Sequence, residues 1–229
     1  RYTGLEDALR WAAELFKLRD RERIVAAFSL DTRVIGQISA ARRGGASRLR
    51  DATARLAEAR SAEAAAPPDA VPPVHALAVT SDGYSLRFSL EPFVEPSTRS
   101  GRRYARLSEG VEVVGVARVT GSETIIAATQ DARAMLCPVE EVNYLSGPGK
   151  GVILIKLQSG EDRVLGFIAS TGDRDLLRVE TSRGGEQTIS TGKYEVRGRG
   201  GKGRELLQRG QFTRVIPAEV ENPVPLSQG

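Results

Sequence analysis

A glycine-rich basic segment in the last third of this chain is the part of the sequence best suited to chemistry. It reads Gly198-Arg199-Gly200-Gly201-Lys202-Gly203-Arg204. Because glycine has no side chain, the amide N–H groups of such a segment can approach an anion closely, and the flanking cations can neutralise phosphate charge. The segment therefore indicates a phosphate-binding turn, although a solvated basic hairpin loop would have the same composition.

A nucleotide-binding P-loop is the main rival for a glycine-rich turn that contains lysine. That motif needs a glycine five residues before its Gly-Lys pair and a serine or threonine after it. Here Val196 occupies the first of these positions and Gly203 the second. The P-loop is therefore excluded.

The basic turn recurs at a fixed place in a repeated unit. Thr80, Thr129 and Thr181 end three similar apolar phrases and lie 49 and 52 residues apart. Lys150 follows Thr129 by 21 residues, and Lys202 follows Thr181 by the same interval. A fixed period with strand-like units predicts a propeller or a related array, in which neighbouring units bury each other's faces.

We call residues 99–103, 148–151 and 200–203 the first, second and third basic turns. Arg42-Arg43-Gly44-Gly45 is a candidate fourth turn, and the approach to a helix with incidental arginines explains it equally well. Turns that recur in register would place positive charge around the array, where a polyanion could bend. The candidate residues for binding such a polyanion are Arg197, Arg199, Gly200, Gly201, Lys202, Gly203, Arg204, Gly149, Lys150, Gly151, Arg99, Arg102, Arg103, Arg42 and Arg43. Tyr104 and Tyr194 lie near these turns and could contact a sugar or base, although core packing is the simpler role for both.

Composition supports a globular chain without an active site. The 229 residues are 40% hydrophobic and 27% charged, and the formal net charge is +4. The chain has one cysteine, which excludes an intramolecular disulfide and a zinc site made of several cysteines. It also has one histidine, so a catalytic triad or a metal site built on histidines is poorly supported. We therefore expect no catalytic residue, no metal site and no cofactor.

The order of elements predicts an N-terminal part and a repeated part. Residues 4–18 and 46–66 favour helices, and Arg23–Leu30 has the pattern of a buried strand. We divide the chain into residues 1–73 (helix, degenerate blade, helical insertion and Pro-rich linker), 74–216 (three repeated β blades) and 217–229 (a loose C-terminal tail). His75 is expected at the edge of the linker, and Cys137 as a buried apolar residue.

No apolar run approaches the length that spans a membrane, and no signal peptide is visible. We therefore expect a cytoplasmic protein with no membrane partner. The chain begins with Arg1, which suggests a piece of a longer protein.

In these residues the chain resembles the C-terminal domain of the A subunit of bacterial type IIA topoisomerases, DNA gyrase and topoisomerase IV. Arg197–Gly203 matches five of the seven positions of the gyrase A box, Gln-Arg-Arg-Gly-Gly-Lys-Gly. Residues 80–87 and 138–142 are also similar to phrases of the family's blades. The best box lies in the last unit and not in the first, and this favours a topoisomerase IV-like subunit or a divergent gyrase.

The resemblance implies an all-β fold, a β-pinwheel with a propeller-like ring of about four blades, here with an N-terminal helix and a helical insertion. It also implies a non-catalytic domain that bends or wraps double-stranded DNA on a basic rim and works in the bacterial nucleoid. The expected partners are DNA, the remainder of the A subunit of an ATP-dependent type II topoisomerase, and the ATPase subunit of that enzyme. The alternatives are a protein-interaction propeller and an RNA-binding β domain.

Overall fold

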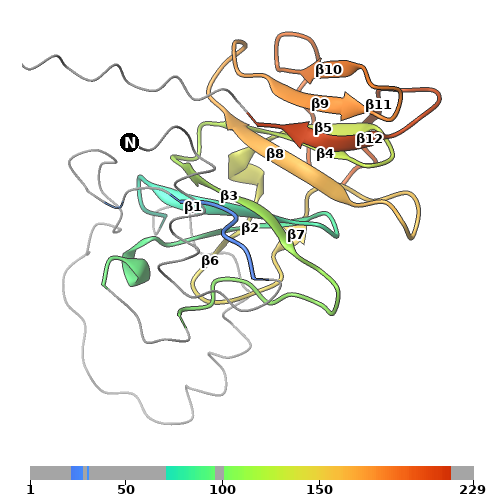
Figure 1. Ribbon diagram of the computed structural model, residues 1–229. Coiled ribbons are helices and arrows are strands. Elements are labelled where there is room, and N and C mark those ends of the chain that lie inside the picture. Colours follow the sequence, from blue (N-terminus) through green and yellow to red (C-terminus); the bar gives the residue numbers. More distant parts are fainter. Residues whose placement is uncertain (1–21, 28–29, 31–70, 96–100, 218–229) are drawn as a thin grey trace, which may run out of the picture.

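The computed structural model describes residues 22–27, 30, 71–95 and 101–217, and their strands form three sheets placed side by side (Figure 1). The helices predicted at 4–18 and 46–66 lie outside the described residues. So do Arg42, Arg43 and Arg99.

Each repeated unit folds into one blade, which consists of a hairpin and a closing strand that pairs with the first strand of the hairpin. The hairpins are β1 (His75–Thr80) with β2 (Tyr84–Phe88), β4 (Thr124–Thr129) with β5 (Arg133–Pro138), and β9 (Leu177–Thr181) with β10 (Glu186–Ile189). The closing strands are β3 (Val113–Val119), β8 (Val164–Ser170) and β12 (Phe212–Ile216). The described residues thus form three blades, one for each repeated unit.

The three aligned threonines are the last residues of β1, β4 and β9, and each lies beside a bulge in the pairing with the closing strand. Three residues further on, the hairpin turn needs a left-handed backbone. Gly83 and Gly184 supply it with φ values of 85° and 79°. Ala132 takes the same position with φ 55°, and it is the one non-glycine residue with positive φ in the described chain.

Blades 1 and 2 each receive their outermost strands from the following unit. β6 (Tyr144–Leu145) and β7 (Val152–Ile153) follow β5 of blade 2 in the chain, yet both pair with β2 of blade 1. β11 (Arg204–Glu205) belongs in sequence to blade 3 and pairs with β5 of blade 2. Two short 3-10 helices complete the described elements, η2 (Glu91–Phe93) and η3 (Val139–Glu141).

Two of the three buried apolar clusters lie between neighbouring blades, because β4 of the middle blade is buried on both faces. Ile125 and Ala127 of β4 pack toward blade 1, whereas Ile126 and Ala128 pack toward blade 3, and all four are fully buried. This explains why β4 lacks the polar alternation of a half-exposed strand.

Glycines in the closing strands let neighbouring blades approach closely. A Cβ atom on Gly115 would lie 3.2 Å from the Phe167 ring, and one on Gly166 would lie 2.8 Å from a Val215 methyl group. In each case the glycine of one closing strand receives a side chain of the next. Arg214 occupies the corresponding position in β12 and pairs with Glu180, so this face of blade 3 is charged.

Two predictions about local structure were wrong. Residues 23–27, the first part of the predicted strand Arg23–Leu30, form no strand, because they find no partner in the blade 1 sheet; Val25 is 37% exposed. His75 is not at a linker edge but fully buried in β1. Its ring nitrogens lie 3.1 Å from the Pro72 carbonyl oxygen and 3.4 Å from the Arg87 guanidinium. Burial, followed by the Arg87 charge, lowers the pKa of His75 to about 4, so the ring is neutral near pH 7.

Candidate nucleic-acid interface

The basic turns lie beside one another because exchanged strands carry the second and third turns onto the preceding blades. The second turn connects β6 to β7 on blade 1, and the third precedes β11 on blade 2. The segment that leaves the first turn runs parallel to the second turn through an Ala105–Gly149 bridge, and Arg106 N–H donates to the Gly149 carbonyl at 2.9 Å. An Ile155–Gly201 bridge joins the segment after the second turn to the third turn in the same way.

The last glycine of each turn has a left-handed backbone, with φ values of 68°, 81° and 68° at Gly101, Gly151 and Gly203. In the second and third turns there is also no room for a side chain. A Cβ on Gly151 would lie 2.2 Å from the Ser85 carbonyl oxygen, and one on Gly203 would lie 2.7 Å from that of Ala134. These glycines therefore place the turns against the preceding blade. Nothing lies within 4 Å of the corresponding atom on Gly101.

The third turn and the residue that follows it present two exposed cations, Lys202 and Arg204. Lys202 is exposed, and its ammonium forms no ion pair with the described residues. The Arg204 guanidinium lies 5.4 Å from the centre of the Tyr194 ring, and Lys193 lies 5.3 Å from the same ring. Arg204 and Lys193 can still bind anions from solvent, because a cation–π contact leaves N–H groups of the cation available.

Two other predicted arginines are engaged within the protein. The Arg199 side chain donates to the carbonyl oxygens of Glu141 at 2.8 Å and Ile153 at 3.3 Å, so it holds the third turn against η3 and β7. Arg197 contacts the Glu195 carboxylate at 3.2 Å and is exposed. Of the two, Arg199 therefore serves the shape of the turn more than an outside ligand.

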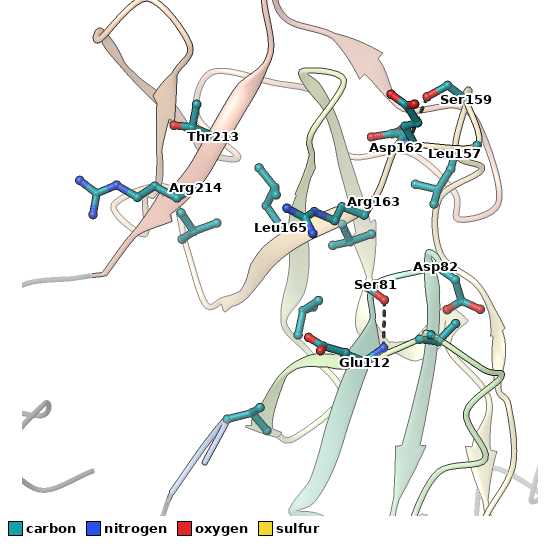
Figure 2. A pocket seen from close by; sticks show the side chains of 18 of the residues that line it. Ser81, Asp82, Glu112, Leu157, Ser159, Asp162, Arg163, Leu165, Thr213 and Arg214 are labelled. Atoms are coloured by element: carbon teal, nitrogen blue, oxygen red, sulfur yellow. Dashed lines mark hydrogen bonds between the residues drawn. The ribbon is translucent and has the colours of Figure 1, made fainter. Parts of the chain in front are cut away.

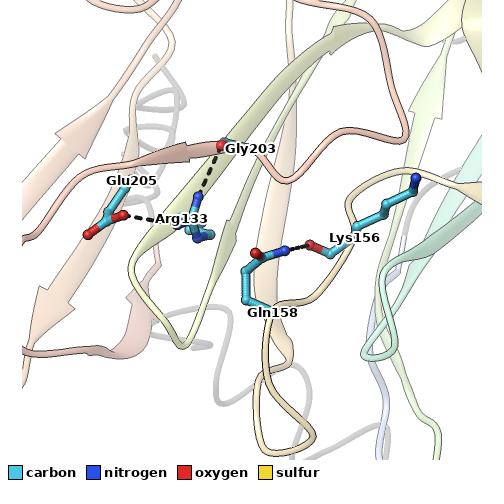
Figure 3. Close-up of polar contacts among 5 residues, drawn as sticks. All are labelled: Arg133, Lys156, Gln158, Gly203 and Glu205. Carbon is cyan, nitrogen blue, oxygen red and sulfur yellow. Dashed lines mark hydrogen bonds and ion pairs between the residues drawn. The ribbon is translucent and has the colours of Figure 1, made fainter.

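Arg133, which the sequence did not single out, supports the third turn from below. It donates to the Gly203 carbonyl at 3.3 Å and to the Glu205 carboxylate at 2.9 Å (Figure 3). Figure 3 also shows Lys156 on the neighbouring segment, with its side chain extended away from this cluster.

The second turn presents its lysine differently. The Lys150 ammonium lies 3.7 Å from the Asp82 carboxylate and 4.0 Å from the centre of the Tyr84 ring. Arg102 and Arg103, the described cations of the first turn, are both exposed. The edge formed by residues 101–106, 148–156 and 200–204, which we call the basic edge, thus joins all three turns. Its exposed cations are Arg102, Arg103, Arg106, Lys156, Lys202 and Arg204.

The two candidate tyrosines differ in what covers their rings. Tyr104 stacks on Phe88 with ring centres 4.5 Å apart and an interplanar angle of 9°, so one face is occupied. Burial raises the pKa of Tyr104. Tyr194 is half-buried, and its hydroxyl accepts a hydrogen bond from Gln187 at 3.2 Å. Both rings thus have packing roles.

A cleft of about 860 Å³ opens where the closing strands meet residues 23–25 (Figure 2). Its walls carry both signs of charge: Arg23 pairs with Glu112 at 2.7 Å, and Arg214 pairs with Glu180. Asp162 is 6% exposed and accepts the Asp131 N–H at 2.9 Å. The cleft therefore lacks the uniform charge of the basic edge. The described residues contain no group of three or more possible metal ligands, and none of their helices could span a membrane.

Three blades, two of which take outer strands from the following unit, and a basic turn in each unit define a propeller-like repeat protein of the β-pinwheel class. Residues 75–120 and 123–171 match the family described as "DNA gyrase C-terminal domain, beta-propeller", one unit in each match. In these two units the chain is similar to the C-terminal domains of the A subunits of type IIA topoisomerases, as the resemblance in its sequence indicated.

Curated relatives and solved structures agree with this assignment. The chain is 34% identical to the DNA gyrase A subunit of Deinococcus deserti over 110 residues, which are 46% of this chain and 13% of the relative. It is 30% identical to the DNA gyrase A subunit of Helicobacter pylori strain J99 over 148 residues, which are 62% and 18% of the two chains. The matched part thus spans less than a fifth of either relative.

Two solved domains share the fold. A crystal structure of the C-terminal domain of DNA topoisomerase IV has a TM-score of 0.56 and 20% identity. The matched region covers 65% of this chain and 49% of the topoisomerase IV chain. A structure of the DNA gyrase A C-terminal domain has a TM-score of 0.52 and 20% identity, and covers 64% and 49%.

Proposed function

We propose that this chain is a non-catalytic DNA-binding domain that bends duplex DNA along its basic edge and presents it to the strand-passage core of a type II topoisomerase. The observation that carries the proposal is the pair of parallel bridges, Ala105–Gly149 and Ile155–Gly201, that place the three turns next to one another. Neighbouring turns can contact neighbouring phosphates of one duplex, whereas scattered turns could not.

The energy of bending requires several turns to act together. Bending 20–30 base pairs by 40–90° costs on the order of 1–6 kcal/mol. One exposed ion pair contributes about 0.2–1 kcal/mol, so the two cations of one turn offset only the smallest bends, whereas six cations spread over three adjacent turns contribute energy of the same size as the whole cost. Contacts to about six phosphates would give a log–log salt slope near −5. Because arginine and lysine on phosphates do not read bases, binding should be largely independent of sequence.

The direct test removes the two exposed cations at the third turn, Lys202 within it and Arg204 directly after it. The double variant Lys202→Ala/Arg204→Ala should weaken binding to duplex DNA by roughly 2- to 30-fold and flatten the salt slope by about 2. Arg199 is left in place because its carbonyl contacts support the turn. A double variant Arg118→Ala/Arg174→Ala removes the same charge from β3 and the β8–β9 loop, outside the basic edge. Equal weakening by both variants would reject the assignment to the basic edge.

Bending and the kind of nucleic acid need separate measurements. Energy transfer between dyes at the two ends of the duplex should rise on binding, and affinity should favour duplexes of several turns over very short ones. Unchanged end-to-end distance would contradict bending. Stronger competition by single-stranded RNA than by duplex DNA would favour the RNA-binding alternative instead.

A further inference from the structure

The second and third turns hold their lysines in different surroundings, although each turn packs on the same place of the preceding blade. Gly151 lies against Ser85 of β2, and Gly203 lies against Ala134 of β5. These contacts make Asp82 and Tyr84 of blade 1 equivalent to Asp131 and Arg133 of blade 2. The molecule therefore contains its own comparison between two versions of one site.

In blade 1 the two residues attract the lysine. Thr80 donates to one oxygen of the Asp82 carboxylate at 2.5 Å, and the other oxygen lies 3.7 Å from the Lys150 ammonium. The threonine thus fixes the carboxylate on the side of the second turn. The face of Tyr84 lies under the same ammonium, at 4.0 Å from the ring centre.

In blade 2 the equivalent residues do not attract the lysine. The Asp131 carboxylate is turned away and accepts hydrogen bonds from Ser159 at 2.9 Å and Gln211 at 3.2 Å. As a result, the buried hydroxyl of Thr129 has no hydrogen-bond partner in the described structure. Arg133 stands where blade 1 has Tyr84, so a cation replaces an aromatic ring beside the third turn.

We infer that Asp82 and Tyr84 act as an internal substitute for a phosphate, holding Lys150 on blade 1 and lowering the share of the second turn in DNA binding. This inference rests on the proposed function. A carboxylate and a DNA phosphate compete for the same ammonium, so the second turn binds DNA only at the expense of its own contact. The third turn has no such competitor, so its lysine makes the stronger contact with DNA. The DNA affinity of each turn is therefore set by residues outside the glycine-lysine motif.

The test uses Asp82→Asn, which keeps an oxygen for the Thr80 hydroxyl and removes the negative charge. Binding to a labelled duplex of about 30 base pairs should tighten roughly two- to fivefold, and the salt slope should steepen by about 1. Asp173→Asn is the matched control, because Asp173 is an exposed carboxylate at the opposite ends of the strands and bonds Thr191 at 2.7 Å. Lys150→Ala should weaken wild-type binding less than Lys202→Ala does.

A second measurement needs no DNA. Brief acetylation followed by mass spectrometry should modify Lys202 faster than Lys150 in the wild type, and Asp82→Asn should bring the two rates together. Equal rates in the wild type would overturn the inference. The inference would also be overturned if Asp82→Asn bound DNA no more tightly than Asp173→Asn. If Lys202→Ala still weakened binding in that case, the proposed function would stand. A wild-type domain that fails to bind duplex DNA would instead reject the proposed function.

Discussion

The amide of Lys156 donates a hydrogen bond to the carbonyl oxygen of Gly201 at 2.8 Å, so the chain leaving one basic turn runs directly alongside the next. The same relationship joins Arg106 to Gly149. The turns are thus in contact through the backbone, and their spacing does not depend on flexible side chains. Substitutions in the blades that hold the turns should therefore change the stability of the domain, which the following experiments measure.

Glycine should be required in the second and third turns for a reason that does not apply to the first. Gly151→Ala and Gly203→Ala each place a methyl group within 2.7 Å of a carbonyl oxygen, in addition to a left-handed backbone. We expect each to lower the free energy of unfolding by about 3 kcal/mol or more in urea denaturation. Gly101→Ala keeps the left-handed backbone but meets open space, and should cost only about 1–2 kcal/mol. Equal losses at Gly101 and Gly151 would contradict the packing argument.

The contact between β8 and β12 should show compensation. Gly166→Ala brings a methyl group 2.8 Å from Val215 and should destabilise the domain by about 1–3 kcal/mol through overpacking. Val215→Ala removes the obstructing methyl groups, so the double variant should be more stable than the sum of the two single effects predicts. A double-mutant cycle in urea measures this coupling. Strict additivity would show that the two blades do not meet at this point.

His75 should make the domain less stable as the pH falls from 6.5 toward 4. Its pKa is about 4 in the folded domain against a reference of 6.5, so over this range the unfolded chain binds more protons than the folded one. Stability is present in full above the unfolded pKa and decreases by up to about 1.4 kcal/mol per pH unit, approaching roughly 3 kcal/mol in total. Urea denaturation between pH 5 and 7 checks the slope, with His75→Gln as the variant that should lose it. A histidine ring that titrates near 6.5 in the folded domain would contradict this.

Cys137 should be unreactive in the folded domain. The side chain is fully buried, and burial raises the pKa of its thiol to about 12, so the reactive thiolate is scarce. Because it is the one cysteine of the chain, thiol labelling reports on a single site. The labelling rate should follow global unfolding and rise with urea. Fast labelling without denaturant would show that the interface between blades 1 and 2 opens locally.

The repeat and its turns could be predicted from the sequence because they depend on local properties. The threonines that end β1, β4 and β9 mark equivalent turns, and the glycines of the second and third turns recur at the same interval as the blades. Alternating buried faces need only a pattern of apolar residues. The buried position of Cys137 followed from the same pattern.

Three features could not be predicted in this way: the buried position of His75, the absence of a strand at residues 23–27, and the contact of Arg199 with Glu141. Each depends on residues distant in the sequence. His75 contacts Arg87, Arg199 contacts η3, and residues 23–27 form no strand because they do not pair with the blade 1 sheet. Ala132 shows the limit even within a turn, because its neighbours impose a backbone conformation that alanine alone disfavours.

By itself the sequence determined the number of repeated units in the described region, the residue types in each turn and the family that the chain resembles, since all of these are carried by order along the chain. Only the tertiary structure decided which blade each turn packs on and which cation is held by a carboxylate. The physical reason is strand exchange: a turn encoded in one unit packs on the preceding blade, so its electrostatic environment is set by residues more than sixty positions away, such as Asp82 for Lys150.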